Sequence, residues 1–162
     1  MRFTPFPNLS TVRFILRAME SNDAPQVLRI RSNEAVNEFI NRNPPQTISD
    51  AEAFISRISN EIAMGKIIFW AIARKDDPTM LGSVCFWNLS EDGKTAELGY
   101  ELHPDHHKQG IMTEAIQETV DFGFSDLGFE QIEAYTHRDN TPSMRLLRKH
   151  GFVLDSSRKD DD

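Results

Sequence analysis

Residues 107–113 read His-Lys-Gln-Gly-Ile-Met-Thr, and this stretch lies between a predicted strand at 95–102 and a long predicted helix from about 110 to 126. The first turn of a helix leaves backbone N–H groups without partners, and these groups and the helix dipole favour an anion such as a phosphate. Gly110 allows a ligand to approach the backbone closely, and Lys108 adds a positive charge. The stretch therefore predicts a phosphate-binding loop.

Two better-known phosphate-binding patterns do not occur in the sequence. The chain has no Gly-x-x-x-x-Gly-Lys-Ser/Thr run of a nucleoside triphosphate site and no Gly-x-Gly-x-x-Gly fingerprint of a dinucleotide site. On local grounds alone, a glycine that serves only a turn is an equal alternative, because many strand–helix junctions bind nothing.

Outward from this junction, apolar patterning and turn residues divide the chain into strands and helices. Short turns at 75–78 and 91–94 join three successive strands, which predicts antiparallel pairing. The strand–helix–strand unit from 95 to 136 predicts a right-handed parallel crossover. We therefore predict an α/β (α+β) fold with a mixed, mostly antiparallel sheet and about four helices. Strands are expected at 11–17, 67–73, 80–88, 95–102, 130–136 and 152–154, and helices after residue 21 and from residues 49, 110 and 141.

Two of the helices carry boundary and face patterns. Ser49 and Glu52 have the spacing of a capping box, which predicts a helix start at Ser49, and Gly65 is its expected end. In the helix that begins near Gly110, apolar residues recur at helical spacing. The predicted inner face consists of Ala115, Ile116, Val120, Phe124 and Leu127.

Length and composition predict a single domain over residues 1–162, with a core at 10–154 and a polar tail at 155–162. The net charge of −7 argues against nucleic acid as a partner and favours a cationic acceptor. Cys85 is the one cysteine and lies in an apolar run, which predicts a buried thiol rather than a nucleophile. The sequence contains no secretory signal pattern and no membrane-span pattern, so we expect a cytoplasmic protein without a membrane partner.

A second motif, NTPSMRLLRKHGF at residues 140–152, makes a resemblance specific. Together with residues 107–113 it resembles the two acyl-CoA motifs of the GNAT superfamily of N-acyltransferases, separated by one helix and one strand as in that family. Residues 11–34 (TVRFILRAMESNDAPQVLRIRSNE) resemble the opening of the ribosomal-protein N-acetyltransferase branch. The resemblance covers residues 11 to about 154. It implies a twisted sheet with a V-shaped splay between two central strands, acetyl-CoA as co-substrate and no metal.

The resemblance also implies a set of cofactor contacts. The pantetheine arm should contact Leu102, and the thioester end of the cofactor should lie beside Asn140 and Ser143. Three positions depart from the family pattern: His107 stands for the usual Gln or Arg, Lys108 for a common Gly, and Met112 for a small residue. We expect binding to survive these changes. The residues expected at the pyrophosphate are Lys108, Gln109, Gly110, Ile111, Met112 and Thr113.

The implied reaction is direct attack of a neutral amine on the thioester. Ser143 is our candidate proton donor to the departing thiolate, and the alternative is a first-turn helix residue that bonds only to backbone. Glu97 is the candidate base, against the alternative of a cross-strand charge. Tyr135 is a further candidate donor, more simply read as a strand aromatic. Three histidines in the loop 103–107 lack a nearby cysteine and do not predict a metal site.

The chain ends about ten residues after Phe152, where the family continues with further strands. We expect either a second subunit in a homodimer to complete the sheet, or a truncated product. Three functions remain open on the sequence. The first is an active N-acetyltransferase acting on a protein N-terminal α-amine, such as that of a ribosomal protein, or on a small amine. The others are a catalytically silent acyl-CoA-binding domain and an interaction module that has kept only the fold.

Overall fold

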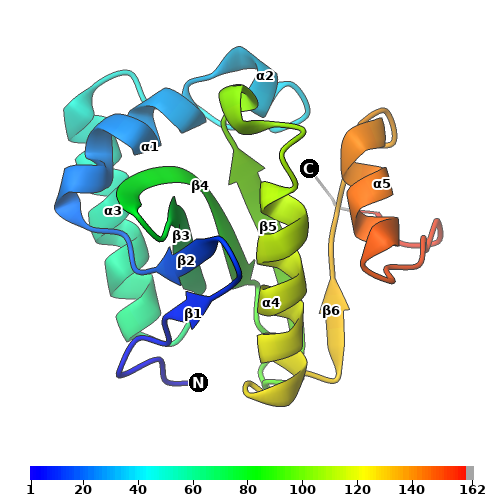
Figure 1. Ribbon diagram of the computed structural model, residues 1–162. Helices are drawn as coiled ribbons and strands as arrows, with labels where there is room; N and C mark the ends of the chain where they lie inside the picture. Colours follow the sequence, from blue (N-terminus) through cyan, green and yellow to red (C-terminus); the bar gives the residue numbers. More distant parts are fainter. Residues whose placement is uncertain (160–162) are drawn as a thin grey trace.

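A computed structural model describes residues 1–159 and shows one mixed sheet with helices on both faces (Figure 1). Within these residues the sheet has six strands in the order of the sequence, β1 to β6. The strands are β1 (Leu9–Ser10), β2 (Phe14–Arg17), β3 (Ile68–Arg74), β4 (Asp77–Trp87), β5 (Thr95–Leu102) and β6 (Gln131–Glu133). The α-helices are α1 (Ala24–Arg31), α2 (Glu34–Asn37), α3 (Ile48–Ala63), α4 (Ile111–Ser125) and α5 (Thr141–Lys149), and short 3-10 turns lie at Ser21–Asp23 and Pro104–His106.

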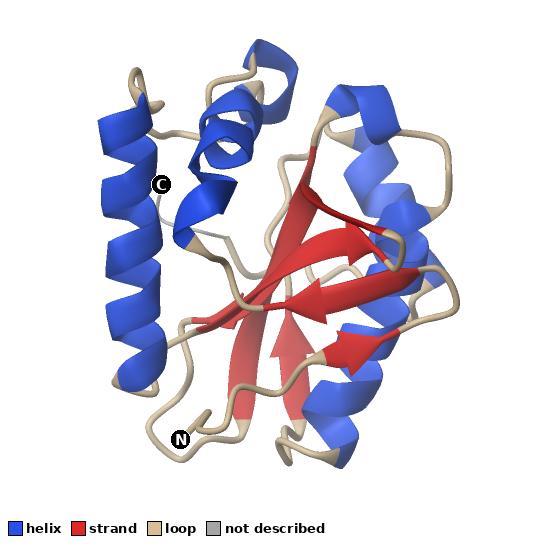
Figure 2. Ribbon diagram, turned by 60° about the vertical axis from the view of Figure 1, so that its left-hand side comes forward, coloured by secondary structure: helices blue, strands red, loops and turns tan. Residues whose placement is uncertain are grey.

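The pairing of the strands confirms the predicted mixed, mostly antiparallel sheet. Strands β1 to β5 pair antiparallel in succession, and β6 pairs parallel with β5. A parallel pair needs a crossover, and α4 provides it. The sheet is curved and lies between the helices, as Figure 2 shows.

Each face of the sheet has its own hydrophobic core, and β3 is therefore buried on both sides. Ile68, Trp70 and Ile72 of β3 point to the core under α4, whereas Phe69 and Ala71 point to the core under α1 and α3. The Trp70 ring is fully buried, and its indole N–H donates a hydrogen bond to the Pro7 carbonyl at 2.8 Å. None of the helices within residues 1–159 has the length and apolar character that a membrane crossing requires.

The feature that positions the site is the parting of β5 from β6. The two strands pair only from Thr95–Gln131 to Glu97–Glu133, although β5 continues to Leu102. The V-shaped splay implied by the family resemblance is therefore present. The sixth strand is shorter than the predicted 130–136, because the chain leaves β5 after Glu133 and runs toward α5.

Three local predictions were wrong in detail. The capping box before α3 is formed by Thr47 and Asp50, so the helix starts at Ile48 rather than Ser49. Phe124 is 46% exposed, and the buried face of α4 uses Gly123 instead. A side chain at 123 would meet the Phe86 ring at 2.8 Å, so close packing of the helix on the sheet decides this face.

The third correction concerns residues 152–154, which form no strand. The Phe152 N–H donates to the Leu147 carbonyl at 3.1 Å, and Gly151 has a φ of +85°, so this segment closes the end of α5. Val153 is left 90% exposed. A cavity of about 440 Å³ lies between this segment, α5 and the outer side of β6.

The entry into α1 depends on a partly buried ion pair. Arg17 of β2 donates two hydrogen bonds of 2.8 Å to the Asp23 carboxylate, whose side chain is only 6% exposed. We predict that Asp23→Ala lowers the free energy of unfolding by about 2–3 kcal/mol, because the partly buried Arg17 guanidinium loses its counterion. Urea unfolding followed by circular dichroism measures the change. Glu130→Ala removes the exposed pair with Lys94 and is expected to cost below about 1 kcal/mol; equal losses would contradict this account.

Candidate active site at the parting of β5 and β6

The start of α4 presents backbone N–H groups to a ligand. Gly110 precedes the helix with a φ of +74°, a left-handed conformation that favours glycine. The first helical hydrogen bond runs from the Glu114 N–H to the Gly110 carbonyl at 3.1 Å, so the N–H groups of residues 111–113 precede it. The side chains of Ile111 and Met112 are buried in the core. Met112 is bulkier than the family residue, but its side chain points away from the loop.

Positive side chains surround this loop. Lys108 is exposed and has a φ of +62°, Arg13 Nη2 donates to the Gln109 carbonyl at 3.0 Å, and Arg74 Nη2 donates to Gln109 Oε1 at 3.4 Å. A shallow cavity of about 800 Å³ opens beside Gly110 and Thr113. The helix start and these cations together suit an anionic ligand.

Glu114 in the first turn of α4 holds the β1–β2 connection against the helix. Its carboxylate accepts hydrogen bonds from Thr11 Oγ1 at 2.7 Å, from the Arg13 N–H at 2.7 Å and from Arg13 Nε at 2.8 Å. Burial raises the pKa of Glu114, but the hydrogen bonds from Thr11 and Arg13 outweigh this effect, so the pKa lies below its ordinary value. Sequence reasoning did not find this contact, because it joins residues about a hundred positions apart.

The histidines before the loop have structural partners. His103 Nδ1 accepts a hydrogen bond from the Asp105 N–H at 3.1 Å, and His107 Nε2 lies 3.1 Å from the carbonyl of Leu102, within hydrogen-bond distance when that nitrogen carries the ring proton. Burial lowers the pKa of His103 and of His106. Within residues 1–159, no three His, Cys, Asp or Glu side chains are grouped so that they could hold a metal ion.

A hydrogen bond joins the two sides of the splay. Tyr100 of β5 and Ser143 of α5 lie with their hydroxyl oxygens 2.5 Å apart, and either can be the donor. Burial raises the pKa of the Tyr100 phenol, although the hydrogen bond to Ser143 acts in the opposite direction. Our sequence reasoning selected Ser143 and missed Tyr100. Strand alternation from Ala96 places Tyr100 on the α4 face and could have pointed to it.

Asn140 holds Ser143 in place. It caps α5, and its Oδ1 accepts a hydrogen bond from the Ser143 N–H at 3.3 Å. The predicted neighbours Asn140 and Ser143 are therefore together, and Tyr100 joins them. Tyr135 is the other candidate donor. Its hydroxyl accepts a hydrogen bond from Arg158 Nη2 at 3.3 Å and lies beside the cavity on the far side of β6.

The structure places Glu97 on the other face of β5. It is 7% exposed, lies at the last position where β5 pairs with β6, and accepts a hydrogen bond from Asn88 Nδ2 at 3.4 Å. Alternation along the strand turns it away from the Tyr100 side. Cys85, on the neighbouring strand, has a thiol whose pKa burial raises to about 12, so it is a neutral thiol at pH 7.

Comparisons with known proteins agree with this geometry. A family model described as an acetyltransferase (GNAT) domain matches residues 13–153. The chain is 35% identical over 147 residues, covering 91% of it, to the uncharacterized N-acetyltransferase YoaA of Bacillus subtilis (strain 168) and spans 83% of that protein. It is 24% identical over 120 residues to the ribosomal-protein-serine acetyltransferase of Escherichia coli (strain K12), covering 72% of this chain and 66% of that one.

A solved structure of a ribosomal L7/L12 α-N-protein acetyltransferase in complex with coenzyme A superposes with a TM-score of 0.80 at 19% identity, covering 91% of this chain and 83% of that one. The fold, the parted strands and the helix-start loop define an acyltransferase architecture. The chain belongs to the GNAT acetyltransferase family. It is accordingly an acetyl-CoA-dependent acetyltransferase, with ribosomal-protein acetyltransferases among its relatives.

The lowered pKa of Glu114 predicts a pH-dependent contribution to stability. A carboxylate whose pKa is lower in the folded than in the unfolded state stabilises the protein above its unfolded pKa, and this stability is lost as pH falls through the folded pKa. Glu114→Gln is expected to lower the free energy of unfolding by about 1–3 kcal/mol at pH 7 and by progressively less as pH falls below about 4.3, the ordinary pKa of a glutamate. Urea unfolding over a series of pH values from 7 downward measures this. Glu118→Gln on the same helix is the control, and a pH-independent loss in Glu114→Gln would contradict the assignment.

Proposed function

We propose that this enzyme transfers the acetyl group of acetyl-CoA to a primary amine by direct attack of the amine on the thioester. The amine is a protein N-terminal α-amine or a small-molecule amine. The observation that carries the proposal is the Tyr100–Ser143 hydrogen bond, which sets a proton-donating pair across the opening between β5 and α5. The start of α4 lies at the end of the same strand.

The residues around the opening fit the parts of the co-substrate. The pyrophosphate is bound by the backbone N–H groups from Gln109 through Thr113, which include Gly110, Ile111 and Met112, with Lys108 nearby. Support comes from the left-handed Gly110, from the free first turn of α4 and from the neighbouring cations. The pantetheine arm follows β5 to Leu102. Asn140 and Ser143 lie beside the thioester end.

Acetyl-CoA supplies an acetyl carbon that is open to nucleophilic attack. The amine nitrogen forms a bond to this carbon, the carbon–sulfur bond breaks, and the leaving sulfur takes up a proton. Ser143 Oγ delivers that proton, and Tyr100 replaces it through their 2.5 Å hydrogen bond. Because burial raises the pKa of the phenol, Tyr100 holds its proton at neutral pH.

Two further residues complete the proposed machinery. Asn140 is a positioning residue, because its side chain fixes the backbone of Ser143 at the first turn of α5. Glu97 is the proposed base that receives the amine proton, through water, on the face of β5 opposite Tyr100. A protein α-amine as acceptor is supported by the ribosomal-protein acetyltransferases among the relatives, and the net charge of −7 attracts cations to the surface.

The cofactor site is tested by isothermal titration of acetyl-CoA into the parent and into Gly110→Asp. The added Cβ would lie 3.3 Å from Arg13 Nη2, so the new carboxylate would compete with the pyrophosphate for the positive charge at this loop, and we predict that it weakens binding by about thirtyfold or more. Gly128→Asp is the matched control, because Gly128 has the same φ of +74° at the other end of α4 and open space around it. Equal binding by the two variants would contradict this site, and no binding by the folded parent would overturn the proposed function.

The proton-donating pair is tested by a double-mutant cycle. We predict that Ser143→Ala and Tyr100→Phe each lower kcat by about a hundredfold, with the Kd for acetyl-CoA nearly unchanged. The double variant should be little slower than either single variant, because both hydroxyls act in one proton path. Release of CoA thiol with an amine acceptor measures kcat. Fully additive effects on kcat would contradict a shared proton path through the two hydroxyls. A parent protein that binds acetyl-CoA but acetylates no amine would indicate a catalytically silent binding domain.

A further inference from the structure

Glu101 of β5 is held by two arginines from outside the sheet. Arg31, the last residue of α1, donates to Glu101 Oε2 at 3.0 Å, and Arg42, in the connection between α2 and α3, donates through Nη2 to Glu101 Oε1. The exposed fractions of the three side chains are 20%, 15% and 10% for Arg31, Arg42 and Glu101. We call these three residues the Arg31–Arg42–Glu101 cluster.

The cluster carries a net positive charge. Two guanidinium groups share one carboxylate, and Arg42 Nη1 is buried without a hydrogen-bond partner within residues 1–159. Arg31 also lies over the Phe54 ring at 4.0 Å. Burial lowers the pKa of each arginine to about 10, so both remain charged at pH 7. A buried N–H donor without a partner is costly, and an incoming anion would relieve that cost.

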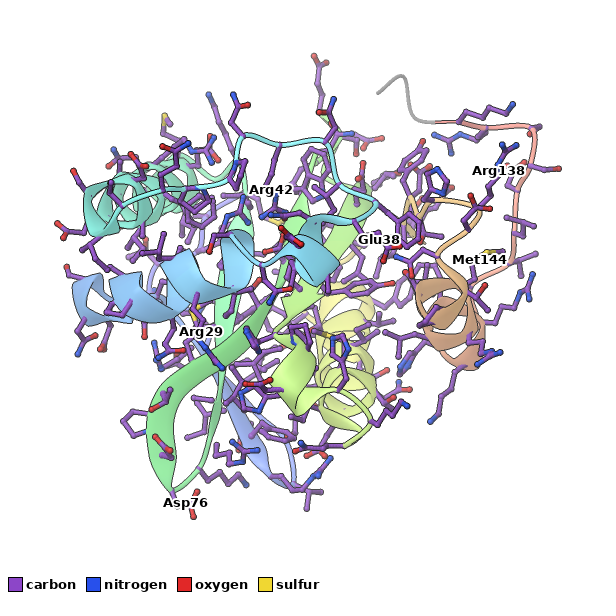
Figure 3. The ribbon with its side chains drawn as sticks, turned by 90° about the horizontal axis from the view of Figure 1, so that it is seen from above. Arg29, Glu38, Arg42, Asp76, Arg138 and Met144 are labelled. Atoms are coloured by element: carbon purple, nitrogen blue, oxygen red, sulfur yellow. The ribbon has the colours of Figure 1, made fainter. Side chains whose placement is uncertain are left out.

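The cluster lies one residue along β5 from the proposed proton donor Tyr100, on the other face of the strand. Glu101 follows Tyr100 directly in β5, in the part of the strand that β6 no longer accompanies, and its side chain points to the opposite face. The chain that carries Arg42 also reaches across the splay, because the Phe39 ring stacks on His137 with centroids 5.1 Å apart. In the view from above, Glu38 and Arg42 lie on this segment over the sheet, and Met144 marks α5 (Figure 3).

We propose that the Arg31–Arg42–Glu101 cluster binds a carboxylate of the acceptor, so that the enzyme acetylates amines that carry a carboxylate a few bonds from the reacting nitrogen. This inference rests on the proposed function and specifies its acceptor. An amino acid and a peptide with an acidic residue near its N-terminus both offer this chemistry. Arg42 provides the free donor, and its planar guanidinium suits a carboxylate.

The local charge and the overall charge of the protein act at different distances. The net charge of −7 attracts a protonated amine from solution. At physiological ionic strength, screening limits such effects to about 8 Å, so the charges at the splay decide the final contacts. If the cluster only anchored the α2–α3 connection to the sheet, one arginine would be enough to pair with the one carboxylate. A purely structural role therefore does not explain why two guanidinium groups are present, or why Arg42 Nη1 is buried without a partner within residues 1–159.

The test is isothermal titration of acceptors into the CoA-saturated protein, in which no acetyl transfer occurs. One pair of probes is a tetrapeptide amide with glutamate or glutamine at its second position, and the other pair is alanine and alaninamide. We expect the carboxylate member of one pair to bind about tenfold or more tightly than its amide. A difference in affinity within the tetrapeptide pair would indicate a peptide acceptor, and a difference between alanine and alaninamide would indicate an amino acid acceptor.

Three variants test the role of the cluster. Arg42→Gln should abolish the preference for the carboxylate, whereas Glu101→Gln should strengthen it by freeing both guanidinium groups. Arg29→Gln is the matched control, because Arg29 lies on the same helix as Arg31 but pairs with the exposed Asp105, and it should keep the parent preference (Figure 3). Urea unfolding of each variant reports folding. If Arg42→Gln does not fold, the inference is tested by Glu101→Gln alone, in which the preference for the carboxylate over the amide should increase.

Several outcomes would overturn the inference. One is equal binding of acid and amide by the parent in both pairs, or binding of neither. Another is an equal loss for acid and amide in Arg42→Gln, which would show a purely structural cluster. A CoA titration on the same samples separates these results from a failure of the proposed function, because a protein that binds CoA but shows no acid preference fails only the inference.

Discussion

The arrangement of the site depends on the short parallel pairing of β5 with β6. The pair ends at Glu97 and Glu133. From Gly99 to Leu102, the edge of β5 that points away from β4 then faces no strand within residues 1–159. Backbone N–H and C=O groups demand partners, so an exposed strand edge inside the fold is suited to an extended ligand. The crossover that a parallel pair requires also brings the start of α4 to the end of β5. The single parallel pair therefore leaves one edge of β5 without a strand and places a helix start suited to an anion at the end of that strand.

Strand alternation divides the chemistry between the two faces of β5. Tyr100 turns to the α4 face and meets Ser143, whereas Glu101 turns to the α1 face and meets Arg31 and Arg42. The proposed proton path and the proposed acceptor contact are thus adjacent in sequence and separated by the sheet. This arrangement suits the proposed direct transfer, with the two substrates approaching from opposite faces of the strand.

Local features were predictable from the sequence, and contacts between distant residues were not. The bounds of β5 at 95–102, the helix start after Gly110 and the start of the last helix at Thr141 follow from patterns within a few residues. The residues 152–154 were wrongly predicted as a strand, because an apolar run does not reveal that its backbone closes α5 instead. The partners of Ser143 and Glu101 lie 43 and 59–70 residues away, and only the folded sheet brings them together.

A crystal structure of the protein with coenzyme A would show whether the parted strands β5 and β6 hold the co-substrate. We predict that the pantetheine arm lies along β5 between Gly99 and Leu102, with the pyrophosphate at the N–H groups of Gly110 through Thr113 and the sulfur within reach of the Ser143 hydroxyl. Coenzyme A bound elsewhere, with β5 and β6 closed onto each other, would contradict the claim that the parted strands form the active site.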